Sequence, residues 1–240
     1  MRKGTQDRLY LRQLLAGRDF ARVHPVAGQM ANFVYLIGDR EAGECVVVDP
    51  AWDVAGILGV AEQDGMRLTG ALATHDHPDH VGGDLFGYNV EGLARLLELC
   101  PVKVHVHRQD AEGLRLVTGL SESDVVRHDG GDRVSAGAVE LTLLHTPGHS
   151  PGSQCFLVGS SLVSGDTLFV QGCGRVDLPG SDPEEMYRTL TTRLATLPGD
   201  TVLYPGHDYG PTPTSTLDME RRSNYSLRVP DLDSWLNLMG

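Results

Sequence analysis

The stretch that decides the fold is ALATHDHPDHVGGD, residues 71–84. It places three imidazoles and one carboxylate, from His75, His77, Asp79 and His80, within six residues and directly after an apolar run. Such crowding becomes favourable when the side chains share a cation, because imidazole nitrogens and carboxylate oxygens are both good metal ligands. The spacing therefore predicts a metal site on the loop that follows this strand.

Three later polar residues have the same setting, because each follows an apolar strand and lies close to glycine. They are His149 in HTPGHSPGS, Asp166 in VSGDTLF and His207 in YPGHDYG. Glycine permits the positive φ and the close backbone approach that a loop around a small site requires. Because strand ends at one edge of a sheet converge, we expect these three residues to join the first cluster.

The complete set contains five imidazoles and two carboxylates, which suits two divalent ions. Seven ligands are too many for one tetrahedral zinc. Zinc is the first expectation, with iron or manganese as alternatives. We assign His75, His77 and His149 to the first metal, and Asp79, His80 and His207 to the second. Asp166 would bridge the two metals, and Asp79 and Asp166 are the expected catalytic carboxylates.

The bulk composition limits the classes of partner, and we expect the substrate to be a small molecule. Hydrophobic residues are 40% of the 240 and charged residues 22%, an ordinary soluble composition. The net charge of -12 disfavours a nucleic-acid partner, and no run is long and apolar enough to cross a membrane. The first residues lack the apolar core of a signal peptide, so we expect a cytoplasmic location. A homodimer is an open alternative.

The order of elements, strands and then a helix, occurs twice without a linker. This order predicts one domain over residues 1–240, an α/β fold with two packed sheets and helices outside. We expect residues 1–20 to form an N-terminal helical arm and residues 211–240 a C-terminal tail. Asp182 and Pro183 predict the start of a helix over residues 182–198. Strands are expected at 32–39, 44–50, 68–75, 102–107, 131–137, 139–149, 153–166 and 201–208, and helices at 54–66, 91–100 and 110–119.

THDHPDH, together with the later His, Asp and His, resembles the metallo-β-lactamase fold superfamily of hydrolases and oxidoreductases. The resemblance extends over about residues 20–225. It implies an αββα four-layer sandwich, in which two mixed β-sheets are flanked by helices and the metals lie at one edge. It also implies that Asp49, in VVVDP, is the buried acid that supports the metal loop.

The expected chemistry is hydrolysis by a metal-bridging hydroxide, because water between two cations loses a proton near neutral pH. Two segments, residues 165–180 and 197–210, look like the glyoxalase II (hydroxyacylglutathione hydrolase) branch, which cleaves acyl-glutathione thioesters. The same segments look like the persulfide dioxygenase branch, in which one iron would be held by His75, His149 and Asp166. A lactone hydrolase and a non-catalytic metal-binding protein are further alternatives.

Arg175 and Tyr209 are the candidates for contact with the substrate. Arg175 could bind a carboxylate through two hydrogen bonds, or it could form a structural ion pair. Tyr209 could donate to a substrate carbonyl, or it could serve packing. His105 and His107 imitate an H-x-H motif, but they lie inside a predicted strand and are expected to be structural. The four cysteines form no C-x-x-C pair, so a thiolate zinc site is not expected.

Overall fold

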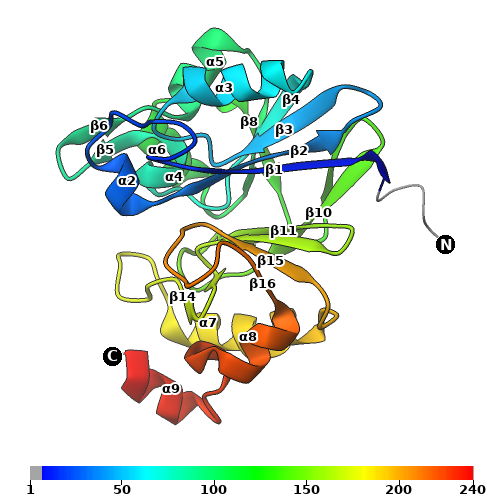
Figure 1. The fold of residues 1–240 in the computed structure, drawn as a ribbon. Coiled ribbons are helices and arrows are strands. Elements are labelled where there is room, and N and C mark those ends of the chain that lie inside the picture. The colour runs from blue at the N-terminus through cyan, green and yellow to red at the C-terminus, as the bar shows by residue number, and fades with distance from the viewer. Residues whose placement is uncertain (1–6, 240) are drawn as a thin grey trace.

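Two six-stranded β-sheets pack face to face, with helices on their outer sides (Figure 1). The computed structural model describes residues 7–239. The first half of the chain forms one sheet, in the order β1-β2-β3-β4-β7-β8, and the second half forms the other, in the order β16-β15-β12-β11-β10-β9. Each sheet contains parallel and antiparallel pairs. The predicted αββα sandwich of two mixed sheets is therefore confirmed.

The first half ends at His128 and carries its longer helices on the outer side of its sheet (Figure 1). Its strands are β1 (Leu9–Leu15), β2 (Phe33–Asp39), β3 (Glu44–Val48), β4 (Arg67–Leu72), β7 (Val104–His107) and β8 (Val125–His128), with a separate hairpin of β5 (Gly83–Leu85) and β6 (Tyr88–Val90). Its helices are α2 (Ala27–Met30), α3 (Val54–Gln63), α4 (Pro78–Val81), α5 (Leu93–Leu99) and α6 (Ala111–Thr118).

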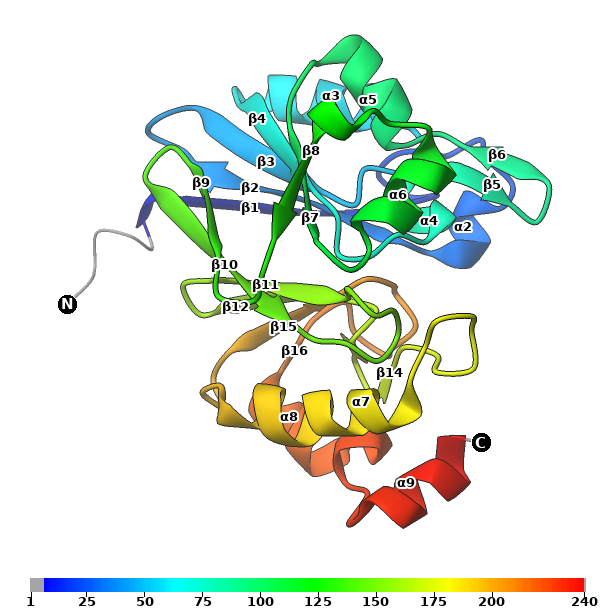
Figure 2. The ribbon, with the colours of Figure 1, turned by 180° about the vertical axis from the view of Figure 1, so that it is seen from behind.

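The second half carries its helices on the opposite outer side, and α8 and α9 lie there together with α7 (Figure 2). Its strands are β9 (Arg133–Ala136), β10 (Val139–His145), β11 (Gln154–Val158), β12 (Ser161–Gly165), β15 (Val202–Pro205) and β16 (Ser215–Thr216), with a small hairpin of β13 (Leu168–Phe169) and β14 (Gly172–Cys173). Its α-helices are α7 (Pro183–Arg188), α8 (Leu217–Ser223) and α9 (Leu232–Met239).

The central strand β2 shows why the sheets are covered on both sides. Every residue of β2 is buried. Phe33, Tyr35 and Ile37 join the core between the two sheets, whereas Val34 and Leu36 join the core under the helices. A strand that is buried on both faces has a nearly continuous run of apolar residues, and residues 33–37 of β2 are such a run.

The predicted helix start at Asp182 is confirmed, because its carboxylate accepts a hydrogen bond from the backbone N–H of Glu185. The α-helix itself ends at Arg188 and continues as a π-helical turn, Thr189–Arg193, and a 3₁₀ turn, Leu194–Thr196. The strands predicted at 32–39 and 44–50 are also confirmed, as β2 and β3, which pair antiparallel.

The predicted N-terminal helical arm over residues 1–20 is wrong for residues 9–20. Leu9–Leu15 forms the edge strand β1, which pairs antiparallel with β2. Leucine, arginine and glutamine favour helix locally, but pairing with β2 and burial of Tyr10 and Leu14 override that preference. Residues 1–6 of the predicted arm lie outside the described residues.

The segment predicted as a C-terminal tail is an integral part of the second half. Residues 215–239 form β16, α8, a 3₁₀ turn and α9. Trp235 of α9 is fully buried, and its indole N–H donates to the carbonyl of Pro183 at 2.7 Å. Among residues 7–239, no helix combines the length and the apolar character that a membrane crossing needs.

Candidate metal centre

The seven predicted ligand residues lie at one edge of the sandwich, five on loops and two in a short helix. His75 follows β4 on the loop that leads to α4, and His149, Asp166 and His207 follow β10, β12 and β15. Residues Asp79 and His80 belong to the short helix α4, which begins with Pro78. The structure therefore brings together side chains from both halves of the chain, at the ends of four different strands.

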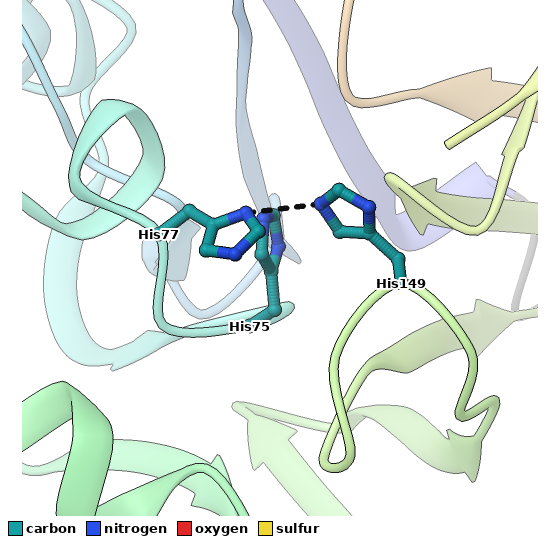
Figure 3. Close-up of side chains that lie close together, drawn as sticks. All are labelled: His75, His77 and His149. Carbon is teal, nitrogen blue, oxygen red and sulfur yellow. Dashed lines mark hydrogen bonds between the residues drawn. The ribbon is translucent and has the colours of Figure 1, made fainter. Parts of the chain in front are cut away.

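Three histidines form the first ligand group, and their rings converge in Figure 3. His77 Nδ1 lies 3.0 Å from His149 Nε2. The ring of His75 is 4.6 Å from that of His77 and 4.8 Å from that of His149. Ligand atoms of His75, His77 and His149 all lie within 4.8 Å of one another, so one cation can contact all three.

The second ligand group consists of Asp79, His80 and His207. His80 Nε2 lies 3.1 Å from His207 Nε2, and Asp79 Oδ2 lies 3.4 Å and 3.5 Å from those two nitrogens. In a tetrahedron with metal–ligand bonds of about 2.0–2.1 Å, ligand atoms are about 3.3–3.4 Å apart. The spacing of these three atoms therefore matches one face of such a tetrahedron.

Asp166 lies between the two groups. Its Oδ2 is 3.6 Å from His149 Nε2 in the first group and 3.3 Å from His207 Nε2 in the second. Its Oδ1 and His75 Nε2 are buried and make no hydrogen bond within the protein. Buried polar atoms are normally satisfied, and a cation would satisfy both atoms. The residues present thus fit a metal centre.

Four of the five imidazoles are held by their other ring nitrogen. His149 Nδ1 donates to the carbonyl of Arg175 at 2.8 Å, and His207 Nδ1 donates to the carbonyl of Met30 at 2.7 Å. A carbonyl can only accept, so both rings keep the lone pair on Nε2, the atom that faces the site. His75 Nδ1 contacts the hydroxyl of Thr74 at 2.9 Å, and His80 Nδ1 contacts Asp49 at 2.9 Å.

Asp49 supports the metal loop from beneath. Its two carboxylate oxygens accept from the backbone N–H and the hydroxyl of Thr74, at 2.7 Å and 2.6 Å, and one of them also contacts His80. Asp49 adopts a left-handed backbone, with φ of 53°, which is uncommon outside glycine. The buried carboxylate thus fixes the position of residues at both ends of the loop.

The two groups differ in electrostatics. Burial and the neighbouring imidazoles lower the pKa of His75 well below its ordinary value and that of His77 to about 4. Burial acts to lower the pKa of His80 too, but the Asp79 and Asp166 carboxylates outweigh it and raise that pKa to about 10. Burial therefore favours the neutral, metal-binding form of His75 and His77, whereas the second group places the His80 imidazole against two carboxylates.

A family model supplies the deciding observation. The model described as "Metallo-beta-lactamase superfamily" matches residues 27–207.

The chain belongs to the metallo-β-lactamase superfamily.

This membership confirms the resemblance read from the sequence. Among relatives of this superfamily member, the human mitochondrial persulfide dioxygenase ETHE1 is 32% identical over 214 residues, which cover 87% of this chain and 76% of the relative. Hydroxyacylglutathione hydrolase of Nitrosococcus oceani is 35% identical over 187 residues, which cover 76% of this chain and 64% of the hydrolase. The crystal structure of ETHE1 from Myxococcus xanthus aligns with a TM-score of 0.77 at 28% identity, over 96% of this chain and 89% of that one.

In this superfamily member, the two substrate-side candidates flank the metal centre. Tyr209 stacks on the ring of His207, with centroids 4.6 Å apart and planes at 11°, and it is 56% exposed. The Arg175 side chain is 66% exposed and pairs with Asp177 at 2.8 Å, while its backbone carbonyl holds His149. The ion pair that the sequence left as an alternative for Arg175 is therefore present.

The other histidines lie outside the metal centre. His105 Nδ1 contacts His128 Nε2 at 2.8 Å, and His107 stacks on His145 with centroids 3.9 Å apart. Within residues 7–239, none of these four histidines belongs to a group with metal-ligand spacing. The four cysteines are free thiols. The H-x-H pair at 105–107 thus has the structural surroundings expected for it.

Sequence reasoning missed the residues that support the second ligand group. The amide of Asn32 donates to Asp79 Oδ2 at 3.1 Å, and the indole N–H of Trp52 donates to Asn32 Oδ1 at 2.9 Å. Asn32 precedes a strand and Trp52 lies in a loop, with nothing in their spacing to link them to residue 79. The one available signal was proximity of Trp52 to Asp49, in DPAWD.

Proposed function

We propose that this chain is a metal-dependent hydrolase that holds two divalent ions, with zinc as the first expectation, and that cleaves a thioester of a small thiol. The observation that carries this proposal is the presence of two three-residue ligand groups with Asp166 between them. Membership of the metallo-β-lactamase superfamily and the hydroxyacylglutathione hydrolase relative also support it.

Two such ions would lower the pKa of a shared water toward neutrality and polarise the carbonyl under attack. The residues of this chain supply the geometry for that chemistry. The backbone carbonyls that hold His149 and His207 fix the direction of both Nε2 lone pairs. Asp79 and Asp166 place negative charge on the second group and between the groups. Thioester cleavage releases a thiolate, which needs no proton donor on leaving.

Tyr209 and Arg175 are proposed to contact the substrate. The Tyr209 ring stacks on His207 and the residue is 56% exposed, so its hydroxyl could reach a carbonyl beside the second group. The Arg175 guanidinium is exposed next to the loop that holds His149, where it could exchange Asp177 for a substrate carboxylate. Tyr209 would thus orient the acyl end and Arg175 the far end of the substrate.

The second candidate function is a persulfide dioxygenase with one iron. The human and Myxococcus xanthus relatives bear that name or its symbol, and they favour this candidate. It would use His75, His149 and Asp166, an arrangement of two histidines and one carboxylate that suits non-haem iron. Under this candidate the second ligand group is not needed for the reaction, and this difference separates the two proposals.

One experiment distinguishes them. Native protein, reconstituted separately with zinc and with iron, is assayed for thiol release from an acyl-glutathione thioester and for oxygen uptake with glutathione persulfide. The hydrolase proposal predicts thiol release that falls steeply in Asp79→Asn, because Asp79 belongs to the second group. Oxygen uptake that survives in Asp79→Asn, without thiol release, would establish the dioxygenase instead. Asp200→Asn, at an exposed position, is the matched control.

Other expectations from the sequence stay predictions. They are a cytoplasmic location, a homodimer, the lack of a nucleic-acid or membrane partner, and a lactone as an alternative substrate. A panel of lactones in the same hydrolysis assay tests the last of these, and sedimentation of purified protein tests the dimer.

A further inference from the structure

A buried amide sits directly against the second ligand group. Asn32 is 2% exposed, and its Nδ2 lies 3.1 Å from Asp79 Oδ2 and 3.3 Å from His80 Nε2. Both of these atoms are among those that would face a cation. Its backbone also pairs with that of His207 in an isolated antiparallel bridge. Asn32 therefore touches all three members of the second group and is not itself a ligand.

The orientation of this amide is imposed by Trp52. An indole N–H can only donate, so the amide must turn its Oδ1 toward Trp52 and its Nδ2 toward Asp79. With the opposite orientation, a carbonyl oxygen would face a carboxylate and both would be left without a proton between them. One donor from Trp52 thus selects which end of Asn32 meets the metal ligands.

The backbone of Trp52 is held in an unfavourable conformation to make this contact. Its φ is 79°, and for a bulky residue a positive φ is a genuine outlier. Such conformations persist where the surroundings over-determine them, and they cluster at functional sites. Here the backbone N–H of Trp52 donates to the carbonyl of Glu91 at 2.8 Å, and the residue is 4% exposed.

One short loop therefore supports the second group from two sides. Within residues 49–53, Asp49 holds Nδ1 of His80, and Trp52 holds Asn32 against Asp79. Two members of the first group are held differently, His75 by the hydroxyl of Thr74 and His149 by the carbonyl of Arg175. A change at Trp52 should therefore affect the second group and spare the first.

We infer that Trp52, acting through Asn32, is a positioning residue that sets the affinity of the second ligand group for its metal ion. The inference rests on the proposed two-metal function. Loss of a supporting hydrogen bond around metal ligands typically costs about 10- to 100-fold in metal affinity. Trp52→Phe removes the N–H and keeps most of the ring, so it isolates this contact.

The test is metal content, measured without any substrate. Zinc-loaded protein is dialysed against increasing concentrations of a zinc chelator, and the ions left per chain are counted by elemental analysis. In Trp52→Phe, the chelator concentration that removes one ion should fall by about 10- to 100-fold, and that for the other ion should stay unchanged. Trp235→Phe is the matched control, because that indole is also buried and donates one hydrogen bond far from the ligands.

Each outcome has a distinct meaning. A Trp52→Phe protein that retains both ions as the native protein does overturns the inference and leaves the proposed function intact. An equal loss of affinity for both ions has the same meaning. A native protein that takes one ion per chain overturns the proposed two-metal function and the inference with it. Asn32→Leu, which removes the amide and keeps Trp52, provides the same test if Trp52→Phe does not fold, and the expected result is the same selective loss.

Discussion

The two halves of the molecule contribute to the metal centre in different ways. The first half supplies four ligand residues on one short segment, the loop after β4 and the helix α4, whereas the second half supplies His149, Asp166 and His207 on three separate loops. Asp49 and Asn32 of the same half support these residues, and a histidine of the second half completes each ligand group. The three residues of the second half meet only after their sheet has formed, so the site depends on how the halves are joined.

Polar contacts at the site edge join the halves next to the ligands. The amide of Gln154 in β11 donates to the carbonyl of Ala73 at 2.9 Å, and Tyr35 in β2 donates to the carbonyl of Pro205 at 2.5 Å. Asp110 after β7 accepts from the hydroxyl of Ser150, beside His149. Each of these contacts ties a strand or loop of one half to a strand or loop of the other. This difference between the halves predicts which substitutions have the largest effects on metal binding, activity and stability.

The largest effect is expected at Asp166, where the second half reaches both ligand groups. Asp166→Asn removes a charge that lies between His149 and His207. Residues that only support metal ligands typically contribute about 10- to 100-fold to activity or metal affinity. We expect Asp166→Asn to lower activity by more than this, with a parallel loss of bound metal. Turnover and metal content per chain check this expectation, with Asp200→Asn as control. An Asp166→Asn protein with native turnover would exclude the bridging position.

The next largest effect concerns the C-terminal helix, which completes the core of the second half. Trp235→Ala removes a fully buried indole that packs near Tyr187 and bonds to Pro183. Truncation of a buried tryptophan costs about 3–5 kcal/mol of unfolding free energy. Urea unfolding checks this value, and Leu238→Ala, at a half-exposed position of the same helix, is the control. Equal stabilities of the two variants would show that α9 contributes little.

A pH-dependent effect is expected at Asp39, which ties the two halves far from the site. Its carboxylate accepts from the backbone N–H of Ala138 at 2.9 Å and pairs with Arg8, and these contacts lower its pKa to about 2. Because the folded pKa is depressed, this stabilisation is present above about pH 4 and is lost as the pH falls toward 2. Asp39→Asn should therefore be less stable than native protein at pH 7.

Urea midpoints at pH 7, 5, 4 and 3 follow this difference. The gap between native protein and Asp39→Asn should be constant from pH 7 to 5 and should narrow below pH 4. A gap that stays constant down to pH 3 would mean that the Asp39 charge does not stabilise the joint between the halves.

The smallest effect is expected at Arg175, whose backbone, and not its side chain, holds His149. Arg175→Ala should keep the native metal content and leave the unfolding free energy close to that of the native protein, because its ion pair is exposed. If the guanidinium binds substrate, KM rises by about tenfold, as loss of a charged hydrogen bond implies, while kcat stays unchanged. Arg95→Ala, which breaks another exposed pair, is the control. An unchanged KM would remove Arg175 from the substrate site.

The sequence revealed the ligands because their chemistry is local and unusual. Three histidines and two aspartates in one hexapeptide, and a histidine or aspartate after each of three later strands, leave few alternatives. Strand β1 was mistaken for a helix because its pairing with β2 is a long-range event that Leu9–Leu15 alone cannot encode. Asn32 and Trp52 were missed for the same reason, since the contact with Asp79 spans 47 residues.

The measurement that tests the central claim most directly is the number of metal ions per chain. Protein is stripped of metal, reconstituted with excess zinc or iron, freed of unbound ions and submitted to elemental analysis. Two ligand groups with Asp166 between them predict two ions per chain, falling to one or fewer in His80→Ala. One ion per chain in the native protein, unchanged in His80→Ala, would contradict the account and leave a single-metal enzyme.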